Sequence, residues 1–279
     1  MQIKNILSID VEEWFQVENL KEVISQEGWA YCEKRLNINI SEILFLLERY
    51  EAKATFFILG WIAEKYPEIV AAIDRRGHEI GSHGYAHKMV FTQTEDEFRE
   101  DVIKSIDILE ELTGKQVLGY RAPSFSINQN SFWAFEILSG LGIKYDSSIF
   151  PIKHPEYGIP SAPRFPFEIK LKNGMKLIEF PLSTVQVFGL NFPVAGGAYL
   201  RILPYCYNRW GIKRLNSEGR TAVVYFHPWE IDPGQPREMV SFSKRFRHYT
   251  NLDIMKQKLK RLLKDFEFTS FSKSGAIDD

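Results

Sequence analysis

The chain alternates short apolar runs with longer stretches of helical periodicity, and this alternation constrains the fold more than any other feature of the sequence. Short apolar runs are typical of buried strands, whereas apolar residues spaced three and four apart are typical of helices. Repeated strand–helix units favour a parallel sheet covered by helices, either open or closed into a barrel. The predicted strands are residues 3–9, 53–59, 78–82, 116–120, 143–145, 221–226 and 266–271, and the predicted helices are residues 38–50, 62–76, 95–112, 128–141, 202–215 and 252–265.

One segment interrupts the alternation. Residues 150–193 are rich in proline, and residues 175–180 alternate between apolar and charged side chains. Both features predict a β-rich insertion around residues 150–193. A chain of 279 residues is long enough to bury the core of one large domain. We therefore expect a single domain over residues 1–279 that carries this insertion.

The composition excludes several classes of protein. A formal net charge of -1 gives no general basic character for binding nucleic acid or an anionic bilayer. Cys32 and Cys206 are far apart and belong to no CxxC motif, which argues against a disulfide framework or a cysteine-based zinc site. No segment approaches the roughly 18 to 20 apolar residues that span a bilayer, and the first residues do not form a secretory signal. We expect a cytoplasmic protein without an integral membrane segment.

Polar residues follow several of the predicted strands directly. In parallel sheets covered by helices, the functional residues lie at the carboxyl ends of the strands. These polar residues should therefore meet at one rim of the fold. They are Asp10 and Glu12 after the first strand, His83 and His87 after the third, Arg121 after the fourth, Asp146 after the fifth, and His227 after the strand at residues 221–226.

His83 and His87 form the first candidate metal-binding pair. Two imidazoles four positions apart, with glycines at positions 81 and 84 loosening the backbone, can converge on one divalent cation. One carboxylate beside them would leave the ion an open position for water. Sites of two histidines and one carboxylate accept zinc, cobalt, nickel or iron, of which we expect zinc.

The ordered motifs of the chain resemble those of the polysaccharide deacetylase family, also called the NodB-homology or carbohydrate esterase family 4 group. The narrower stretches at residues 10–15 and 227–232 are similar to the branch found with bacterial exopolysaccharide biosynthesis loci. The resemblance implies a distorted (β/α) barrel of about seven units. The matching motifs are Asp10-Val11-Glu12-Glu13-Trp14, His83 with His87, Arg121-Ala122-Pro123, Tyr145-Asp146-Ser147-Ser148 and Tyr225-Phe226-His227.

This resemblance implies a metal-dependent hydrolase that removes N-acetyl groups from an N-acetylated sugar of a polysaccharide or its precursor. Asp10 would then be the base that takes a proton from water, held ionised by Arg121. His227 would be the general acid, with Asp146 raising its pKa and fixing its tautomer. The metal ligands would be Glu12, His83 and His87, and a backbone N–H near Ser124 or Phe125 would complete the oxyanion site.

The carboxylate ligand departs from the usual family motif. The family has two adjacent aspartates, whereas Val11 separates Asp10 from Glu12 in this chain. In an extended strand alternate side chains share a face, so Asp10 and Glu12 should point the same way and Val11 the other. Glu13 competes with Glu12 for the third ligand position, and the sequence leaves the two open.

Aromatic residues near the predicted rim are candidates for contact with the carbohydrate. Trp14 and Trp229 are the expected platforms for stacking a sugar ring, and Pro123 and Phe125 are further expected contacts. The carbohydrate is the only partner that we expect, and the sequence does not predict an oligomeric state.

Each candidate residue also has an ordinary structural interpretation. Acids at a strand end are usually solvated, Arg121 beside Pro123 fits a braced turn, and Asp146 fits a helix cap. The joint order of five motifs at predicted strand ends favours the functional interpretation. Two other functions stay open: a carbohydrate-binding protein without activity, and a hydrolase of cyclic amides similar to allantoinase.

Overall fold

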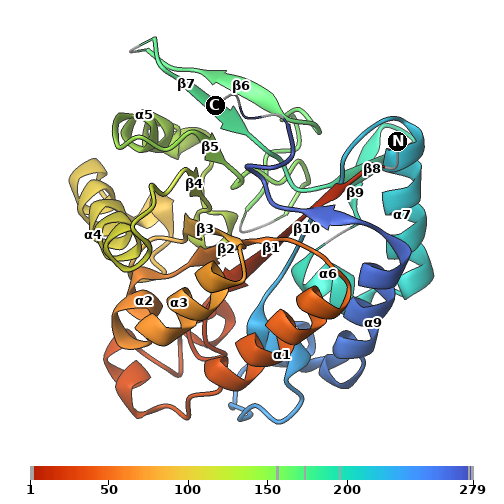
Figure 1. Cartoon of the computed structure of the whole chain (residues 1–279), viewed down its shortest axis with the longest axis horizontal. Coiled ribbons are helices and arrows are strands. Elements are labelled where there is room, and N and C mark those ends of the chain that lie inside the picture. The colour runs from red at the N-terminus through yellow and green to blue at the C-terminus, as the bar shows by residue number, and fades with distance from the viewer. Residues whose placement is uncertain (1–2, 155–156, 173, 195, 276, 278–279) are drawn as a thin grey trace.

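A computed structural model of the chain describes residues 3–154, 157–172, 174–194, 196–275 and 277. Its centre is a curled sheet with the strand order β10-β1-β2-β3-β4-β5-β7-β6, and helices lie around the outside of the curl (Figure 1). Neighbouring strands from β10 to β7 are parallel, β6 is antiparallel to β7, and β11 pairs with β1. The predicted (β/α) architecture is thus confirmed as a half-barrel. The strands are β1 Asn5–Val11, β2 Thr55–Ile58, β3 Glu79–Ser82, β4 Gly119–Tyr120, β5 Tyr145–Asp146, β6 Phe167–Lys170, β7 Lys176–Glu179, β8 Thr184–Val187, β9 Leu190–Pro193, β10 Val223–Phe226 and β11 Phe268–Thr269.

The helices follow the predicted periodicity with two exceptions that involve proline. The helix predicted at residues 62–76 is two helices, because Tyr66 precedes Pro67 and leaves the helical region. The helix predicted at residues 202–215 is likewise divided at Pro204. Helix α8 was not predicted. The helices are α1 Leu36–Arg49, α2 Gly60–Lys65, α3 Pro67–Arg75, α4 Glu95–Thr113, α5 Trp133–Gly140, α6 Gly197–Ile202, α7 Tyr205–Ser217, α8 Phe242–Tyr249 and α9 Leu252–Asp265.

The described part of residues 150–193 contains four strands. β6 and β7 extend the main sheet, whereas β8 and β9 form a separate antiparallel hairpin. The hairpin lies beside α7 (Figure 1), where the Tyr207 hydroxyl donates to the backbone oxygen of Pro193 at 3.1 Å. None of the helices in the described part of the chain combines the length and the apolar character needed to cross a bilayer.

Side chains along each strand alternate between two environments. On β1, Leu7 and Ile9 join the main core between the sheet and the helices, whereas Ile6 joins a second cluster inside the curl. The same alternation continues to Ser8 and Asp10, which both accept hydrogen bonds from Arg121. Period-two geometry therefore sends Asp10 to the inside of the half-barrel.

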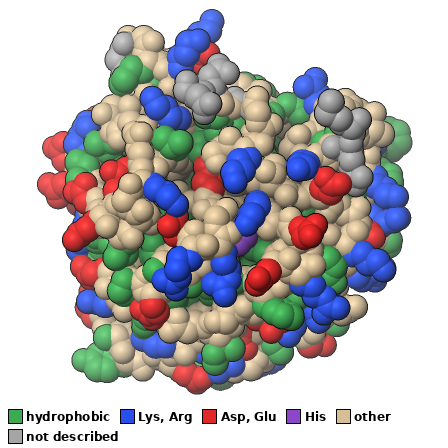
Figure 2. All heavy atoms as spheres, viewed as in Figure 1, with side chains coloured by type: hydrophobic (Ala, Val, Ile, Leu, Met, Phe, Trp, Pro, Cys, Tyr) green, Lys and Arg blue, Asp and Glu red, His purple; other side chains and the backbone are tan. Residues whose placement is uncertain are grey.

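Aromatic rings fill much of the inside. The contacts among these rings fall into two groups, one around Phe271 and one around Phe125, with ring centroids 4.9 to 6.4 Å apart. This packing closes the inside of the curl below the polar rim. The rings belong to Phe57, Phe125, Tyr145, Phe150, Phe180, Tyr225 and Phe271. On the outer surface seen in Figure 2, Lys and Arg side chains are interspersed with Asp and Glu.

Two buried carboxyl groups face each other across β5 and β7. Asp146 and Glu179 are register partners, and each has one buried oxygen without a hydrogen bond. Burial raises the pKa of Asp146 to about 7. Burial and the charge of Asp146 raise the pKa of Glu179 well above its usual range. At least one of the two groups therefore carries a proton in the folded protein near neutral pH.

We predict that this pair makes the folded protein less stable as the pH rises. The pKa of Asp146 is about 7 when folded and about 4 when unfolded. The folded state therefore binds more protons in that window, and the free energy of unfolding falls as the pH increases through it. Glu179→Gln removes one titrating group and the repulsion, so its stability should fall less steeply, by up to roughly 1.4 kcal/mol per pH unit.

Urea unfolding at several pH values measures this slope. Glu168→Gln, at a half-exposed acid on β6, is the matched control and should keep the wild-type slope. Equal slopes for wild type and Glu179→Gln would contradict the prediction.

Candidate active site

A cleft of about 400 Å³ opens at the carboxyl ends of the parallel strands. Its walls come from the ends of β1, β3 and β10 and from the loops after β3 and β4. The predicted residues Asp10, Glu12, His83, His87 and His227 all line it. The structure thus brings together side chains that are more than 200 positions apart in the sequence.

Glu12, His83 and His87 form a group that can hold a divalent metal. One ligand atom from each residue lies within 4.8 Å of the other two. Oε2 of Glu12 is buried, lies 2.8 Å from Nε2 of His87, and has no hydrogen bond of good geometry. A buried carboxylate oxygen beside two imidazoles is the donor set that a zinc-like ion takes, so the residues fit such an ion.

The loop after β3 presents both imidazoles to the cleft. Gly84 has φ of 73° and His87 has φ of 53°, in the region that L side chains seldom adopt. The backbone N–H groups of Tyr85 and Ala86 donate to the carboxylate of Asp101 on α4, which holds the loop in place. The strained conformation of His87 costs free energy, and in this position it directs the ring toward Glu12.

His83 is fixed as a neutral imidazole. Its Nδ1 lies 2.7 Å from the backbone oxygen of Arg121, so Nδ1 carries the proton and Nε2 is left with a lone pair. Burial lowers the pKa of His83 to about 4, which keeps the ring uncharged near neutral pH. This tautomer is the one that a metal ligand requires.

Glu12 is held ionised among histidines. Burial alone would favour the protonated form, but His87, His227 and His83 outweigh burial and lower the pKa of Glu12 to about 2. Its other oxygen, Oε1, accepts a hydrogen bond of 3.1 Å from Nε1 of Trp229. One oxygen is therefore oriented by a tryptophan, and the other faces the two imidazoles.

Glu13 does not compete for the ligand position. Its Oε1 accepts hydrogen bonds from the backbone N–H groups of Arg35 at 2.8 Å and of Leu36 at 2.9 Å. These groups form the amino terminus of α1, where a carboxylate accepts hydrogen bonds from N–H groups that have no partner within the helix. Glu13 caps a helix, and Glu12 faces the histidines.

Asp10 makes the predicted contact with Arg121. Nη1 of Arg121 donates to Oδ1 of Asp10 at 2.7 Å, and the guanidinium has no exposure to solvent. The other carboxylate oxygen, Oδ2, lies 3.9 Å from Nε2 of His227. Asp10 therefore has one oxygen occupied by a fixed cation and the other directed toward the cleft.

The hydrogen-bond partner of His227 lies three residues further along the chain. Nδ1 of His227 lies 3.0 Å from Oε2 of Glu230, whose Oε1 accepts a hydrogen bond of 3.0 Å from the buried Arg201. Burial opposes protonation of the ring, but Glu12, Glu230 and Asp10 raise the pKa of His227 to about 9. His227 is therefore protonated near neutral pH, with Nε2 directed toward the cleft.

The expected pairing of Asp146 with His227 is wrong. On β5 the side chain of Tyr145 points inside the curl, so that of its neighbour Asp146 points to the opposite face. The carboxylate of Asp146 accepts a hydrogen bond from the hydroxyl of Ser148. That hydroxyl in turn accepts from the backbone N–H of Ala122 at 2.8 Å, so Asp146 supports the loop that follows Arg121.

Two of the four expected carbohydrate contacts line the cleft. Phe125 and Trp229 belong to its wall. The ring of Trp229 stacks between His227 and His248 at centroid distances of 5.2 and 4.3 Å. Trp14 is instead buried beneath the rim, where its Nε1 donates to the backbone oxygen of Glu33 at 2.9 Å. The expectation that Trp14 stacks on a sugar is therefore wrong.

Pro123 is buried and does not belong to the cleft wall. The turn that it begins has positive φ at both Ser124 and Phe125. The backbone N–H of Phe125 donates to the oxygen of Ala122 at 3.0 Å, so it is not available to an oxyanion. Ser124 lines the cleft and becomes the candidate donor of the two.

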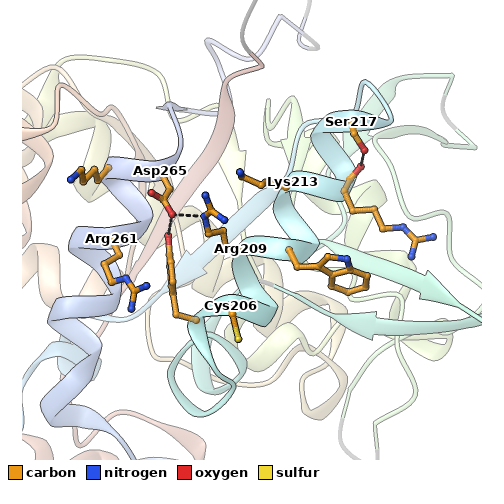
Figure 3. A pocket seen from close by; sticks show the side chains of 10 residues that line it. Cys206, Arg209, Lys213, Ser217, Arg261 and Asp265 are labelled. Carbon is orange, nitrogen blue, oxygen red and sulfur yellow. Dashed lines mark hydrogen bonds and ion pairs between the residues drawn. The ribbon is translucent and has the colours of Figure 1, made fainter.

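A second and wider groove lies between α7 and α9 on the outside of the fold (Figure 3). Arg209, Lys213 and Arg261 contribute cations to it, and Asp265 accepts hydrogen bonds from Tyr205 at 2.8 Å and from Arg209 at 2.7 Å. Among the described residues, the groups that can hold a metal do not include any from this groove. The chemistry is therefore concentrated at the strand ends.

Comparison with known proteins identifies the region that contains the histidine pair. Residues 31–145 match the family model described as polysaccharide deacetylase. This part of the chain is therefore similar to the polysaccharide deacetylase family. Residues 147–275 match a second model, described as a domain of unknown function. The predicted resemblance to the polysaccharide deacetylase family is confirmed.

Curated relatives match parts of the chain. A peptidoglycan-N-acetylglucosamine deacetylase of Bacillus cereus is 43% identical over 96 residues, which are 34% of this chain and 35% of that protein. A peptidoglycan deacetylase of Helicobacter pylori is 30% identical over 147 residues, 50% of this chain and 47% of the relative. The matches thus span about a third to a half of the length of these relatives.

Solved structures share the fold over nearly the whole chain. A structure from Mycobacterium smegmatis, described as a polysaccharide deacetylase, has a TM-score of 0.64 at 20% identity and covers 97% of this chain and 88% of its own. An allantoinase has a TM-score of 0.58 at 16% identity, with coverages of 97% and 89%. At these identities the likeness shows the fold alone.

The deacetylase domain match does not contain the whole cleft. His83, His87 and Arg121 lie inside residues 31–145, whereas Asp10 and Glu12 precede this region and His227 follows it. Glu230, which holds His227, was missed in the sequence. Its signal is the spacing of three from His227 at the start of a short helical turn, where an acid returns to the backbone N–H of the cap residue.

We predict that Glu12, and not Glu13, is required for metal binding. Glu12→Gln should weaken retention of a divalent ion by at least about a hundredfold, because an amide replaces the ionised ligand. Glu13→Gln should keep the ion and lose stability, because a charge at the amino terminus of α1 is removed. Elemental analysis after dialysis, with His83→Ala as the positive control for metal loss, measures the content. Loss of metal from Glu13→Gln alone would contradict the assignment.

Proposed function

We propose that the protein is a metal-dependent N-deacetylase that hydrolyses the N-acetyl group of an N-acetylated sugar in a polysaccharide or its precursor. The observation that carries this proposal is the convergence of Asp10 and His227 with the group Glu12, His83 and His87 inside one cleft. The deacetylase domain match and the names of the relatives support the same reaction.

The ligand set would hold a single divalent ion, and we propose zinc. Glu12, His83 and His87 supply three protein ligands and leave room for water and for the acetyl oxygen. When bound, the ion would supply a Lewis acid that polarises the acetyl carbonyl and lowers the pKa of water. All remaining steps fall to side chains of the chain itself.

Asp10 is the proposed base. Its Oδ1 is occupied by Arg121, which leaves Oδ2 to take a proton from the attacking water. The fixed guanidinium also prevents the carboxylate from turning away from the cleft. As the tetrahedral intermediate forms, negative charge develops on the acetyl oxygen, and the backbone N–H of Ser124 is the proposed donor to it.

His227 is the proposed general acid. The C–N bond breaks only if the departing nitrogen receives a proton, because an amide anion is a poor leaving group. Nε2 of His227 faces the cleft with that proton, while Glu230 holds Nδ1 at 3.0 Å and stabilises the charged ring. After C–N cleavage the products are acetate and the free amino sugar.

The wall of the cleft supports the proposed substrate class. Phe125, Tyr199, Tyr225 and Trp229 provide aromatic surface beside the reacting groups, a combination that suits the apolar faces of sugar rings. The motifs at residues 10–15 and 227–232 support a role in exopolysaccharide biosynthesis. The side chains needed for acid and base are both present, which favours an active enzyme over a silent carbohydrate-binding protein.

We predict that Asp10→Asn abolishes most of the deacetylation while leaving the metal in place. Asparagine keeps the hydrogen bond to Arg121 but cannot accept a proton, so kcat should fall by about a hundredfold to ten-thousandfold. Acetate release from N-acetylglucosamine oligomers by metal-loaded protein is the measurement. Asp96→Asn, at an exposed acid in the first turn of α4, is the control and should keep the wild-type rate.

Failure of metal-loaded wild type to release acetate from any N-acetylhexosamine oligomer or lipid-linked precursor would overturn the proposed function. Release from a cyclic ureide instead would assign the allantoinase-like reaction.

We predict that Glu230→Gln moves the alkaline limit of activity to lower pH. Removing the negative charge beside Nδ1 lowers the pKa of His227, so the ring loses its proton at a lower pH and the general acid is lost sooner. The pH profile of kcat distinguishes this effect from damage to the fold. Misfolding would lower kcat equally at every pH, and an unmoved alkaline limb would contradict the role of Glu230.

A further inference from the structure

Helix α8 presents an unusual outer surface beside the mouth of the cleft. Phe242 and Phe246 are four positions apart on one face of the helix, and their side chains are 85% and 50% exposed. Met239, three residues before the helix, is 86% exposed. Three large apolar side chains are thus exposed to water within eight residues, which folding of the domain does not explain.

The same segment is strongly basic. From residue 239 to residue 252 it contains Lys244, Arg245 and Arg247 but no aspartate or glutamate. The ammonium group of Lys244 reaches Glu22, at 2.8 Å, on a neighbouring loop. In a chain with a formal net charge of -1, these cations are concentrated locally beside exposed apolar groups. This combination is the physical signature of a helix that lies in the interface of an anionic bilayer.

The inner face of α8 is fixed to the active site. His248 is buried and stacks on Trp229 with a centroid distance of 4.3 Å. Its Nε2 lies 3.0 Å from Oε1 of Gln235. Trp229 in turn donates to Glu12, and Arg247 of the same helix lines the cleft. Any surface that covers the outer face of α8 would therefore lie next to the entrance through which a sugar must pass.

The exposed side chains fit hydrocarbon better than they fit sugar. Phenylalanine and methionine have neither a hydroxyl nor an indole N–H with which to hydrogen-bond a saccharide, whereas tryptophan and tyrosine do. Acyl chains accept apolar groups without such bonds, and the phosphates of a bilayer attract lysine and arginine at the same depth. An anionic bilayer therefore matches both the charge and the apolar face of α8.

We propose that α8 seats the mouth of the cleft on an anionic phospholipid bilayer, so that the enzyme takes its N-acetylated sugar from a lipid-linked saccharide. The sugar assignment rests on the proposed function, whereas the contact with the bilayer stands on α8 alone. Phe242 and Phe246 enter the boundary of the acyl chains, and Arg245 lies among the phosphates.

Vesicle co-sedimentation without substrate tests the contact. The full chain should bind vesicles of phosphatidylcholine mixed with phosphatidylglycerol and should bind pure phosphatidylcholine far more weakly. The double variant Phe242→Ser/Phe246→Ser should bind the mixed vesicles at least about tenfold more weakly. Arg245→Glu, an independent exposed substitution, should weaken binding by about tenfold to thirtyfold.

Two matched controls separate α8 from the rest of the surface. Phe45→Ser removes an aromatic side chain of α1 that is 56% exposed, and it should bind like wild type. Lys213→Glu reverses a charge in the groove between α7 and α9 (Figure 3) and should change binding by less than about twofold. A loss in Lys213→Glu equal to that in Arg245→Glu would show general electrostatic attraction and would overturn the proposal.

Activity on two substrates tests the consequence for the enzyme. Phe242 and Phe246 do not line the cleft, so the double variant should deacetylate water-soluble N-acetylglucosamine oligomers at the wild-type rate. Its rate on a lipid-linked N-acetylglucosamine saccharide held in mixed vesicles should fall at least about tenfold. Absence of wild-type vesicle binding, or binding that the double variant retains, would overturn the proposal. Preferential binding of soluble alginate through α8 would also overturn it, in favour of an anionic polymer.

Vesicle binding and deacetylation are measured separately. A protein that binds vesicles through α8 and releases no acetate would refute the proposed function while leaving the bilayer contact supported.

Discussion

The guanidinium of Arg121 lies inside the curled sheet without exposure to solvent, and the arrangement of the cleft depends on its hydrogen bonds. It donates to Ser8 and Asp10 on β1 and to the backbone and hydroxyl oxygens of Ser147 after β5, at 2.7 to 2.9 Å. The backbone oxygen of Arg121 accepts a hydrogen bond from Nδ1 of His83. One residue therefore positions the proposed base, fixes the tautomer of a proposed metal ligand and joins distant strands. A buried cation is tolerated here because nearly every donor has an acceptor.

Strand alternation explains why several site residues could be predicted from the sequence. Asp10 lies on β1, and His227 directly follows β10. Both strands are apolar runs long enough to show which alternate residues point inside the curl. Asp146 could not be placed in this way. Its strand consists of two residues, so nothing in the local pattern tells whether Tyr145 or Asp146 faces the cleft. The direction is set by pairing with β4 and β7, which a single sequence does not encode locally.

Other features were not predicted, because the net charge averages over the whole chain or because the feature depends on contacts between distant segments. The net charge of the chain indicated no affinity for an anionic surface, yet it sums over the whole sequence and hides the acid-free segment that contains α8. Trp14 has an aromatic ring of the kind that stacks on sugars, but its indole is buried against a segment 19 positions away. Glu13 and Glu12 are adjacent and chemically alike, and only the position of the amino terminus of α1 gives them different tasks.

The proposed acid, His227, and the proposed base, Asp10, differ in which buried charge lies next to each of them. Asp10 contacts Arg121 directly, so the fixed charge nearest to its carboxylate is positive. His227 contacts Glu230, and Arg201 lies behind that carboxylate. The nearest fixed charge to the imidazole is therefore negative and favours the protonated ring that an acid requires. Each carboxylate thus has its own buried arginine, and two groups 3.9 Å apart differ in the sign of the fixed charge that lies nearest to them.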